Sequence, residues 1–376
     1  MKIFQIIPSL SDGGAERFVV DLCNQLAGDR HKVTLCSLFA LEGSYQYFKQ
    51  ELLTDVELIS LDKKPGFDIS VIFKLKKILN KYRPDVIHTH VRALNYLLPI
   101  LMMDTYNVIH TVHNDANKEI ANDRERRVRY WFYQKKKVIP VTISNESDRT
   151  FKHVYPNVTS TVIYNGTRKP APSTQFETIK RFFEDTRHNN AARIFVHIGR
   201  LKNQKNHLLL ISAFKKLLED GVNALLIMIG AERDGEESRQ IALAIKKACA
   251  GTRNIIWIGG NQPATDYLML ADFFCLSSIY EGMPISLIEA FATGCLPICT
   301  PVGAIPEMMD GNDFLATGTT EDAYYRALAT AYASPKEKLI FLRDKFMTLF
   351  NEKYAMKHCA NSYEQLYKDL LCKNGI

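Results

Sequence analysis

The chain has 376 residues, of which 46% are hydrophobic and 24% charged. This is the composition of a globular protein, and it excludes collagen, a coiled coil and long disorder. The 48 Lys and Arg residues outnumber the 41 Asp and Glu residues, leaving a net charge of +7. At about 100–200 residues per domain, the length predicts two domains.

The eight cysteines include no C-x-x-C pair, and several lie inside apolar runs. This usage is typical of reduced thiols in a cytoplasmic protein rather than of a disulfide framework. Residues 1–7 carry an apolar run too short for a secretory signal and read as a first strand. The most apolar stretch, residues 93–103, is about half the length that crosses a bilayer. We therefore expect a soluble protein that at most rests on a membrane surface.

Short apolar runs alternate with amphipathic stretches through the first half of the chain. Because these runs are almost continuously apolar, they predict parallel strands that are covered on both faces. The expected strands are residues 2–8, 32–38, 56–61, 85–89, 107–112, 138–144 and 161–164. The expected helices are residues 15–26, 69–82 and 124–136.

The same rhythm restarts in the second half of the chain. Residues 169–192 are rich in Pro, Ser, Thr and charge, and we predict a linker there. Strands are then expected at 193–198, 224–229, 255–258, 273–277 and 296–300, and helices at 208–218, 235–250, 265–271 and 285–293. From about residue 320 onward the pattern is helical only.

This organisation predicts an α/β fold with two doubly wound, Rossmann-like parallel-sheet domains, at residues 1–168 and 193–354. C-terminal helices close the fold, and the last, at about 355–376, is free to pack back on the first domain. Ligands of such sheets bind beyond the carboxyl ends of the strands. Two facing sheets would therefore bind a ligand in a cleft between them, and the polar residues just after strands are the candidates.

A glycine pair opens the first expected helix. Gly13 and Gly14 let the backbone approach a ligand, and the helix start offers free N–H groups to an anion. The segment does not match G-x-G-x-x-G, so it favours no dinucleotide, and a plain glycine turn is the alternative.

Two cations follow the first strand of the second half. The Arg200 fork and the Lys205 point charge flank a short loop, and together they suit a diphosphate. Two solvated surface cations are the alternative interpretation.

The segment 277–290 (SSIYEGMPISLIEA) is the richest in the chain. Pro284 suits the first turn of a helix, which would aim the amides of residues 282–285 (Gly282, Met283, Pro284 and Ile285) at an anion. Glu281 and Glu289 are too far apart for a tight carboxylate pair but could contact different hydroxyls of one extended ligand. A helix-capping acid and an ordinary surface glutamate are the alternative.

Four histidines end two neighbouring expected strands, at positions 88, 90, 110 and 113. No Cys or carboxylate pattern accompanies them, so we expect no metal site. His113 is the best placed to face the ligand, either to bind it or to move a proton.

Residues 118–137 hold eight basic and three acidic residues with four consecutive aromatic residues. A basic, aromatic helix can rest on an anionic membrane, and a solvated helix face with its aromatic side chains in the core is the alternative. No nucleic-acid reading module accompanies the patch, so we expect no nucleic-acid partner.

With these motifs assembled, the chain resembles the retaining GT-B glycosyltransferases of family 4. The resemblance rests on SDGGAER, THVRALNY, TVHN, IYNGT, HIGRLKNQKNH and EGMPISLIEAFATGCLPICTPVGAIPE. The last block carries the Glu–seven residues–Glu pattern of this family as Glu281 and Glu289. Asn206 departs from the pattern, because many members have Gly there.

The resemblance implies a nucleotide-sugar donor held mainly by the second domain, and an acceptor on the first. Arg200 and Lys205 would hold the diphosphate together with the amides of residues 282–285, and Glu289 the ribose. Glu281 and His113 would contact the transferred sugar, and Gly14 would approach the donor from the first domain. It also implies front-face transfer without a cofactor or a metal ion.

We therefore expect a hexose or N-acetylhexosamine to pass from a UDP- or GDP-linked donor to a glycan or lipid-linked glycan in bacterial surface polysaccharide synthesis. The enzyme would be cytoplasmic, or at the inner face of the membrane, with contact through residues 118–137. The alternatives are a GT-B sugar-nucleotide epimerase and a catalytically silent nucleotide-sugar-binding protein.

Overall fold

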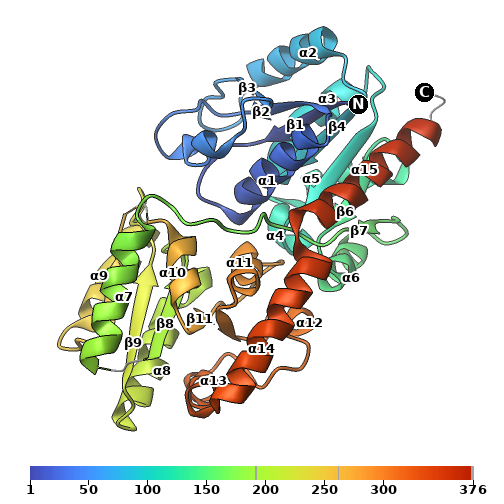
Figure 1. Ribbon diagram of the computed structural model, residues 1–376. Coiled ribbons are helices and arrows are strands. Elements are labelled where there is room, and N and C mark those ends of the chain that lie inside the picture. Colours follow the sequence, from blue (N-terminus) through green and yellow to red (C-terminus); the bar gives the residue numbers. More distant parts are fainter. Residues whose placement is uncertain (191–192, 261, 374–376) are drawn as a thin grey trace. The chain divides into compact units, whose positions relative to one another are not determined.

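The computed structural model describes residues 1–190, 193–260 and 262–373, and the chain divides into two compact units (Figure 1). Unit 1 comprises Met1–Arg168 and Lys353–Ile376, and unit 2 comprises Lys169–Glu352. Each unit is built around its own parallel sheet with helices on both faces.

The sheet of unit 1 has seven strands in the order β3-β2-β1-β4-β5-β6-β7, and every pair is parallel. The strands are β1 (Lys2–Ile7), β2 (Lys32–Ser37), β3 (Glu57–Ser60), β4 (Val86–His90), β5 (Val108–Val112), β6 (Ile139–Thr142) and β7 (Thr161–Val162). The central strands are buried along almost their whole length, as strands covered on both faces must be.

The described residues of unit 1 form seven α-helices. They are α1 (Gly14–Gly28), α2 (Ser70–Tyr82), α3 (Leu94–Leu101), α4 (Ala116–Glu119), α5 (Asp123–Gln134), α6 (Asn145–Val154) and α15 (Met356–Lys373). Side-chain caps fix the starts of three of them, and Asp115 caps α4 by accepting from the Asn117 amide. Asn122 accepts a hydrogen bond from the Glu125 amide at α5, and Ser144 accepts one from the Ser147 amide at α6.

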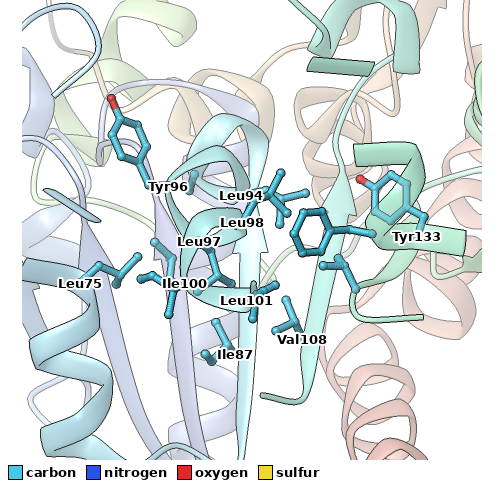
Figure 2. Close-up of a cluster of buried hydrophobic side chains, with 14 of the residues drawn as sticks. Leu75, Ile87, Leu94, Tyr96, Leu97, Leu98, Ile100, Leu101, Val108 and Tyr133 are labelled. Carbon is cyan, nitrogen blue, oxygen red and sulfur yellow. The ribbon is translucent and has the colours of Figure 1, made fainter. Parts of the chain in front are cut away.

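One hydrophobic core lies between the sheet of unit 1 and helices α2, α3 and α5. Leu75 of α2 and Leu97 and Leu101 of α3 lie together with Ile87 of β4 and Val108 of β5 (Figure 2). The apolar stretch at residues 93–103 is thus largely helix α3, which packs in this core. No helix in the described part of the chain is long and apolar enough to span a membrane.

The C-terminal helix α15 is fastened to unit 1 by buried tyrosines. The Tyr367 hydroxyl lies 2.8 Å from Nδ1 of His88 on β4, and the Tyr363 hydroxyl lies 2.8 Å from Oγ1 of Thr111 on β5. Because both hydroxyls are buried, losing either contact would leave a polar group unsatisfied in the core.

The sheet of unit 2 has five parallel strands in the order β10-β9-β8-β11-β12. They are β8 (Arg193–Ile198), β9 (Ala224–Ile229), β10 (Ile255–Ile258), β11 (Phe273–Leu276) and β12 (Leu296–Cys299). The helices are α7 (Phe176–Asn190), α8 (His207–Glu219), α9 (Glu236–Cys249), α10 (Ala264–Leu270), α11 (Ile285–Thr293), α12 (Ile305–Met309), α13 (Glu321–Ala333) and α14 (Lys336–Leu349).

All twelve predicted strands are present, and the two-domain Rossmann-like fold is confirmed. The linker prediction for residues 169–192 is wrong for most of its length, because residues 176–190 form helix α7. Ile179 and Phe183 of this helix are buried, and Phe183 packs edge-on against Tyr267 of α10. The charged residues between these two apolar positions hid the amphipathic pattern. Residues 191–192 of the predicted linker lie outside the described residues.

The eight cysteines all lie in the described part of the chain, and all are free thiols. Six of them are buried, and burial raises the pKa of these thiols, to about 12 for Cys359. They therefore behave as small hydrophobic side chains in the two cores.

Candidate active site

The candidate site of unit 2 lies where its strand order reverses. Strand β8 pairs with β9 on one side and with β11 on the other, so the chain leaves β8 and β11 at neighbouring carboxyl ends. The segments that follow them, residues 199–206 and 277–284, therefore flank the crevice in which open parallel sheets bind ligands.

Close backbone contacts shape the first of these segments. A Cβ atom on Gly230 would lie 2.3 Å from the Gly199 carbonyl oxygen, so only glycine allows the ends of β8 and β9 to approach this closely. Asn206, just before α8, has φ 51° and ψ 50°. This left-handed conformation is most accessible to Gly and, next to it, Asn, which explains why Asn can stand at this position.

Lys205 and Glu281 join the two segments. The Lys205 ammonium lies 2.6 Å from Oε1 of Glu281, and the two side chains are only 15% and 8% exposed. Ser278 donates a second hydrogen bond to the same oxygen at 2.6 Å. A half-buried ion pair of this kind holds its carboxylate in one place, because separating the two charges would leave each of them poorly solvated.

Gln204 ties the same two segments through its backbone and side chain. Its carbonyl accepts from the Ile279 amide at 2.8 Å, and its side-chain amide donates to the Tyr280 carbonyl at 2.9 Å and to Oε2 of Glu281 at 3.4 Å. The sequence motifs contain Gln204 and Ser278 but gave no reason to single them out. Their only signal is position, since each is a polar residue close behind a strand.

Arg200 supplies a second cation at this edge of the sheet. Its side chain is half-buried, and within the described residues its guanidinium has no hydrogen-bond or ion-pair partner. A guanidinium without a partner that is partly withdrawn from water is available to an anionic ligand.

Helix α11 begins at the same crevice. Pro284 is its N-cap, with φ −71° and ψ 121°, one position before the first helical turn in which the sequence placed it. The first amides of any helix lack intrahelical acceptors, so those from Ile285 onward add partial positive charge here. The Met283 and Ile285 side chains are buried, which leaves the backbone of residues 282–285 to present the helix start. Glu289 lies half-buried in the second turn.

Gly303 lets a third loop close on the site. It has φ +56°, and a Cβ atom there would lie 2.0 Å from the carbonyl oxygen of Glu281. The neighbouring Ala304 amide donates to the Gly282 carbonyl at 3.0 Å. The loop after β12 therefore packs against the backbone of Glu281 and Gly282 and donates a hydrogen bond to it.

In unit 1, Gly14 is the first residue of α1 and is exposed, while Gly13 is the buried N-cap. A Cβ on Gly13 would meet the Glu16 carboxylate at 2.0 Å, and Ser11 donates to that carboxylate at 3.0 Å. The two glycines thus have different functions, because Gly13 makes room for Glu16 and Gly14 leaves the helix start open.

His113 follows β5 in unit 1 and is buried. Its Nε2 lies 2.9 Å from Nδ1 of His90, whose Nε2 lies 2.7 Å from the Gln5 amide oxygen. The His113 backbone amide donates to Glu119 at 2.6 Å. Burial lowers the pKa of His113 to about 4, so the imidazole is neutral at pH 7.

The neighbouring histidines have structural partners. Both ring nitrogens of His88 and of His90 contact other side chains, and burial lowers the pKa values of both rings. Among the described residues, no group of three or more His, Cys, Asp or Glu side chains is placed to hold a metal ion.

The basic stretch at residues 118–137 divides between core and surface. Phe132 and Tyr133 are buried, as is Arg129, which forms an ion pair with Glu125 at 2.8 Å. Trp131 is exposed, and Lys137 lies 5.6 Å above its ring. One part of this stretch therefore packs in the core, and another part lies at the surface.

Comparison with known proteins assigns the two units together. The family "Glycosyltransferase Family 4" matches residues 12–168, and the family "Glycosyl transferases group 1" matches residues 178–341. The chain belongs to glycosyltransferase family 4.

Individual relatives agree with this family. The chain is 26% identical to an Escherichia coli UDP-Gal:alpha-D-GlcNAc-diphosphoundecaprenol alpha-1,3-galactosyltransferase, over 66% of this chain and 64% of the relative. It is 23% identical to N-acetyl-alpha-D-glucosaminyl L-malate synthase of Bacillus anthracis, over 97% of each chain.

Solved structures establish the fold as GT-B. Anabaena HepE in complex with UDP-glucose superimposes with a TM-score of 0.80 at 15% identity, covering 98% of this chain and all of HepE. The two Rossmann-like units of the family 4 enzyme are therefore those of a GT-B glycosyltransferase, as the sequence motifs indicated.

We predict that Gly303→Ala destabilises unit 2 by more than backbone strain alone. The added methyl group would collide with the Glu281 carbonyl, so the loop must move, and we expect a loss of unfolding free energy of about 2–4 kcal/mol. Urea unfolding measures this loss.

Gly311→Ala is the matched control. Gly311 also has a positive φ, of 68°, but nothing lies within 4 Å of an added Cβ, so only the strain of about 1–2 kcal/mol applies. Equal losses in the two variants would contradict the close approach at Gly303.

Proposed function

We propose that this family 4 glycosyltransferase is a retaining enzyme. It transfers a hexose or N-acetylhexosamine from a UDP- or GDP-sugar to a glycan or lipid-linked glycan in bacterial surface polysaccharide synthesis. The observation that carries the donor assignment is the Lys205–Glu281 ion pair, which lies at the strand-order reversal next to a helix start.

The diphosphate of the donor fits the cations of this crevice. Arg200 offers a planar fork, Lys205 a point charge and α11 the partial charge of its first amides. These groups stabilise the charge that develops on the departing nucleoside diphosphate, which is the electrostatic contribution of a preorganised site. Glu289 accepts from the ribose hydroxyls, and Glu281 accepts from hydroxyls of the transferred sugar.

The hydrogen bonds of Glu281 bear on the route that the proposed retaining transfer takes. Its Oε1 already accepts from Lys205 and Ser278, and its Oε2 lies 3.4 Å from the Gln204 amide, so the carboxylate is poorly available as a nucleophile. We therefore propose front-face transfer. The bond from the anomeric carbon to the diphosphate breaks, the bond to the acceptor oxygen forms on the same face, and the acceptor proton passes to the departing phosphate oxygen.

Unit 1 contributes Gly14 and His113 to the proposal. The exposed Gly14 at the start of α1 lets a donor phosphate or sugar approach the backbone. The neutral His113 ring contacts the transferred sugar as a hydrogen-bonding group, since its lowered pKa removes the charged form at pH 7.

The acceptor class rests on the relatives. The E. coli relative acts on a diphosphoundecaprenol-linked sugar, whereas the B. anthracis relative is named for L-malate. We propose the lipid-linked class, with the enzyme at the cytoplasmic face of the membrane. The exposed Trp131 and the cations of residues 118–137 that remain at the surface support contact with anionic lipid.

The first test is donor binding and turnover in two variants. Lys205→Ala removes a charge that stabilises the leaving group, so we expect turnover to fall about 10²–10³-fold. Glu289→Gln replaces the carboxylate that accepts hydrogen bonds from the ribose hydroxyls with a weaker, neutral group. We expect nucleotide affinity to fall about tenfold, with a smaller effect on turnover. A thermal-shift panel of UDP, GDP, ADP and their sugars identifies the donor beforehand.

Lys202→Ala is the control for this test. Lys202 lies on the same loop but is exposed and forms its ion pair, at 3.7 Å, with Glu237. Wild-type turnover in both the Lys205 and the Glu289 variants would contradict the site. Binding of a nucleotide sugar without any transfer would instead favour the catalytically silent binding protein. Epimerisation of the nucleotide-linked sugar in the absence of an acceptor would favour the epimerase.

The second test concerns the metal ion. Because Arg200, Lys205 and α11 supply the positive charge, we propose that the enzyme transfers sugar at an unchanged rate in excess chelator. Sugar transfer by the purified chain is measured with and without EDTA. Strict dependence of activity on a divalent cation would contradict this mechanism.

A further inference from the structure

Three of the most exposed large hydrophobic side chains in the described residues lie within seven positions of one another. Phe67, Ile69 and Phe73 are 71%, 62% and 69% exposed. They lie in unit 1, on the loop after β3 and the first turn of α2. Single exposed apolar residues are ordinary, but a cluster of this kind marks a surface that contacts something other than water.

Helix α2 has a buried apolar face and, opposite to it, an exposed face that also begins with an apolar residue. Val71, Leu75 and Leu79, spaced four apart, face the core. Phe73 lies two positions from both Val71 and Leu75, which places it about 160° away around the helix. Lys77, one turn further along, shares this outward face. The helix therefore presents an apolar first turn followed by cations to the outside.

The charged side chains of this segment are almost all cationic. Residues 63–82 contain six lysines and a single acid, Asp68. Asp68 is occupied within the loop, where it accepts from the Ser70 amide at 3.1 Å, the Ser70 hydroxyl at 2.6 Å and the Lys64 amide at 3.0 Å. The surface that remains is apolar and cationic.

The exposed loop has a defined shape. The Phe67 ring stacks on Tyr96 of α3, with centroids 5.5 Å apart and planes 16° from parallel. The Tyr96 hydroxyl accepts from the Asp68 amide at 3.3 Å, and the Lys63 ammonium donates to the Gly66 and Lys64 carbonyls. These contacts hold Phe67 outward instead of letting it fold into the core, so little entropy is lost when it meets a partner.

The surface continues over the neighbouring helices. The buried faces of α2, α3 and α5 share one core, so their outer faces lie on the same side of the sheet (Figure 1). Lys76 of α2 pairs with Asp104 beyond α3 at 3.1 Å, and Lys137 beyond α5 donates to the Leu101 carbonyl at 2.9 Å. Met103, just beyond α3, and Trp131 of α5 are also exposed.

We propose that Phe67, Ile69 and Phe73 form the apolar anchor of a membrane-docking surface on unit 1, and that its occupant is an anionic lipid bilayer. Apolar side chains that enter the interface, flanked by lysines that attract anionic headgroups, are the two components of such docking. The basic stretch at residues 118–137 is then the electrostatic flank of this surface and not its anchor. This inference rests on the proposed function, because a lipid-linked acceptor is the reason for the enzyme to bind a membrane.

Vesicle co-sedimentation of the full chain tests this proposal. We expect binding to vesicles that contain phosphatidylglycerol, weaker binding to vesicles of phosphatidylcholine alone, and a fall in binding as salt is raised. The double variant Phe67→Ser/Phe73→Ser removes two apolar groups from the interface. We expect its partition coefficient on anionic vesicles to fall by at least about tenfold.

Phe341→Ser is the matched control, because Phe341 is 67% exposed on α14 of unit 2, and its binding should equal that of the wild type. Wild-type binding in the double variant would overturn the proposal, as would a loss confined to Trp131→Ser. Unchanged melting temperatures and nucleotide-induced thermal shifts show that the variants are folded. Because the vesicles contain neither donor nor acceptor, failure here is separable from failure of the proposed function, which the donor panel decides.

Discussion

The ion pair between Lys205 and Glu281 is the interaction on which the proposed donor site depends. It joins the segment after β8 to the segment after β11, and Ser278 and Gln204 fasten the same carboxylate from two further directions. A carboxylate held in this way is oriented before any ligand arrives. In our proposal, the excess positive charge that a diphosphate needs comes from the start of α11 and from Arg200, whose side chain has no partner among the described residues.

The constraints around this pair are mostly steric. Gly230 and Gly303 occur where a Cβ atom would strike a backbone oxygen, and Asn206 has the left-handed conformation that otherwise belongs to glycine. These positions bring three loops to one edge of the sheet at distances that larger residues would not allow. Residues that carry no charged group thus determine how closely the loops with Lys205 and Glu281 approach each other.

The strands of both units could be predicted from sequence because parallel strands are covered on both faces and appear as apolar runs. The helix α7 could not, because Ile179 and Phe183 are embedded in charge and their partner Tyr267 lies far along the chain. Glu281 and Lys205 were predicted from motifs and lie in contact. Gln204 and Ser278 could not be predicted, because what distinguishes them is a hydrogen bond to the Glu281 carboxylate and not a sequence motif of their own.

Surface character was harder to predict than the strands. Residues 118–137 appear basic and aromatic in sequence, yet Arg129, Phe132 and Tyr133 are buried. Phe67 and Phe73 carry no signal in the sequence that singles them out, and both are exposed. Which face of a helix meets the core depends on neighbouring elements, and only the packed structure supplies them.

A crystal structure of the full chain with its nucleotide-sugar donor would test the proposed donor site. We expect the diphosphate to lie within hydrogen-bonding distance of Arg200, of Lys205 and of the first amides of α11, with the sugar hydroxyls facing Glu281. A diphosphate bound at another edge of unit 2, with the surroundings of Lys205 and Arg200 unchanged, would contradict it.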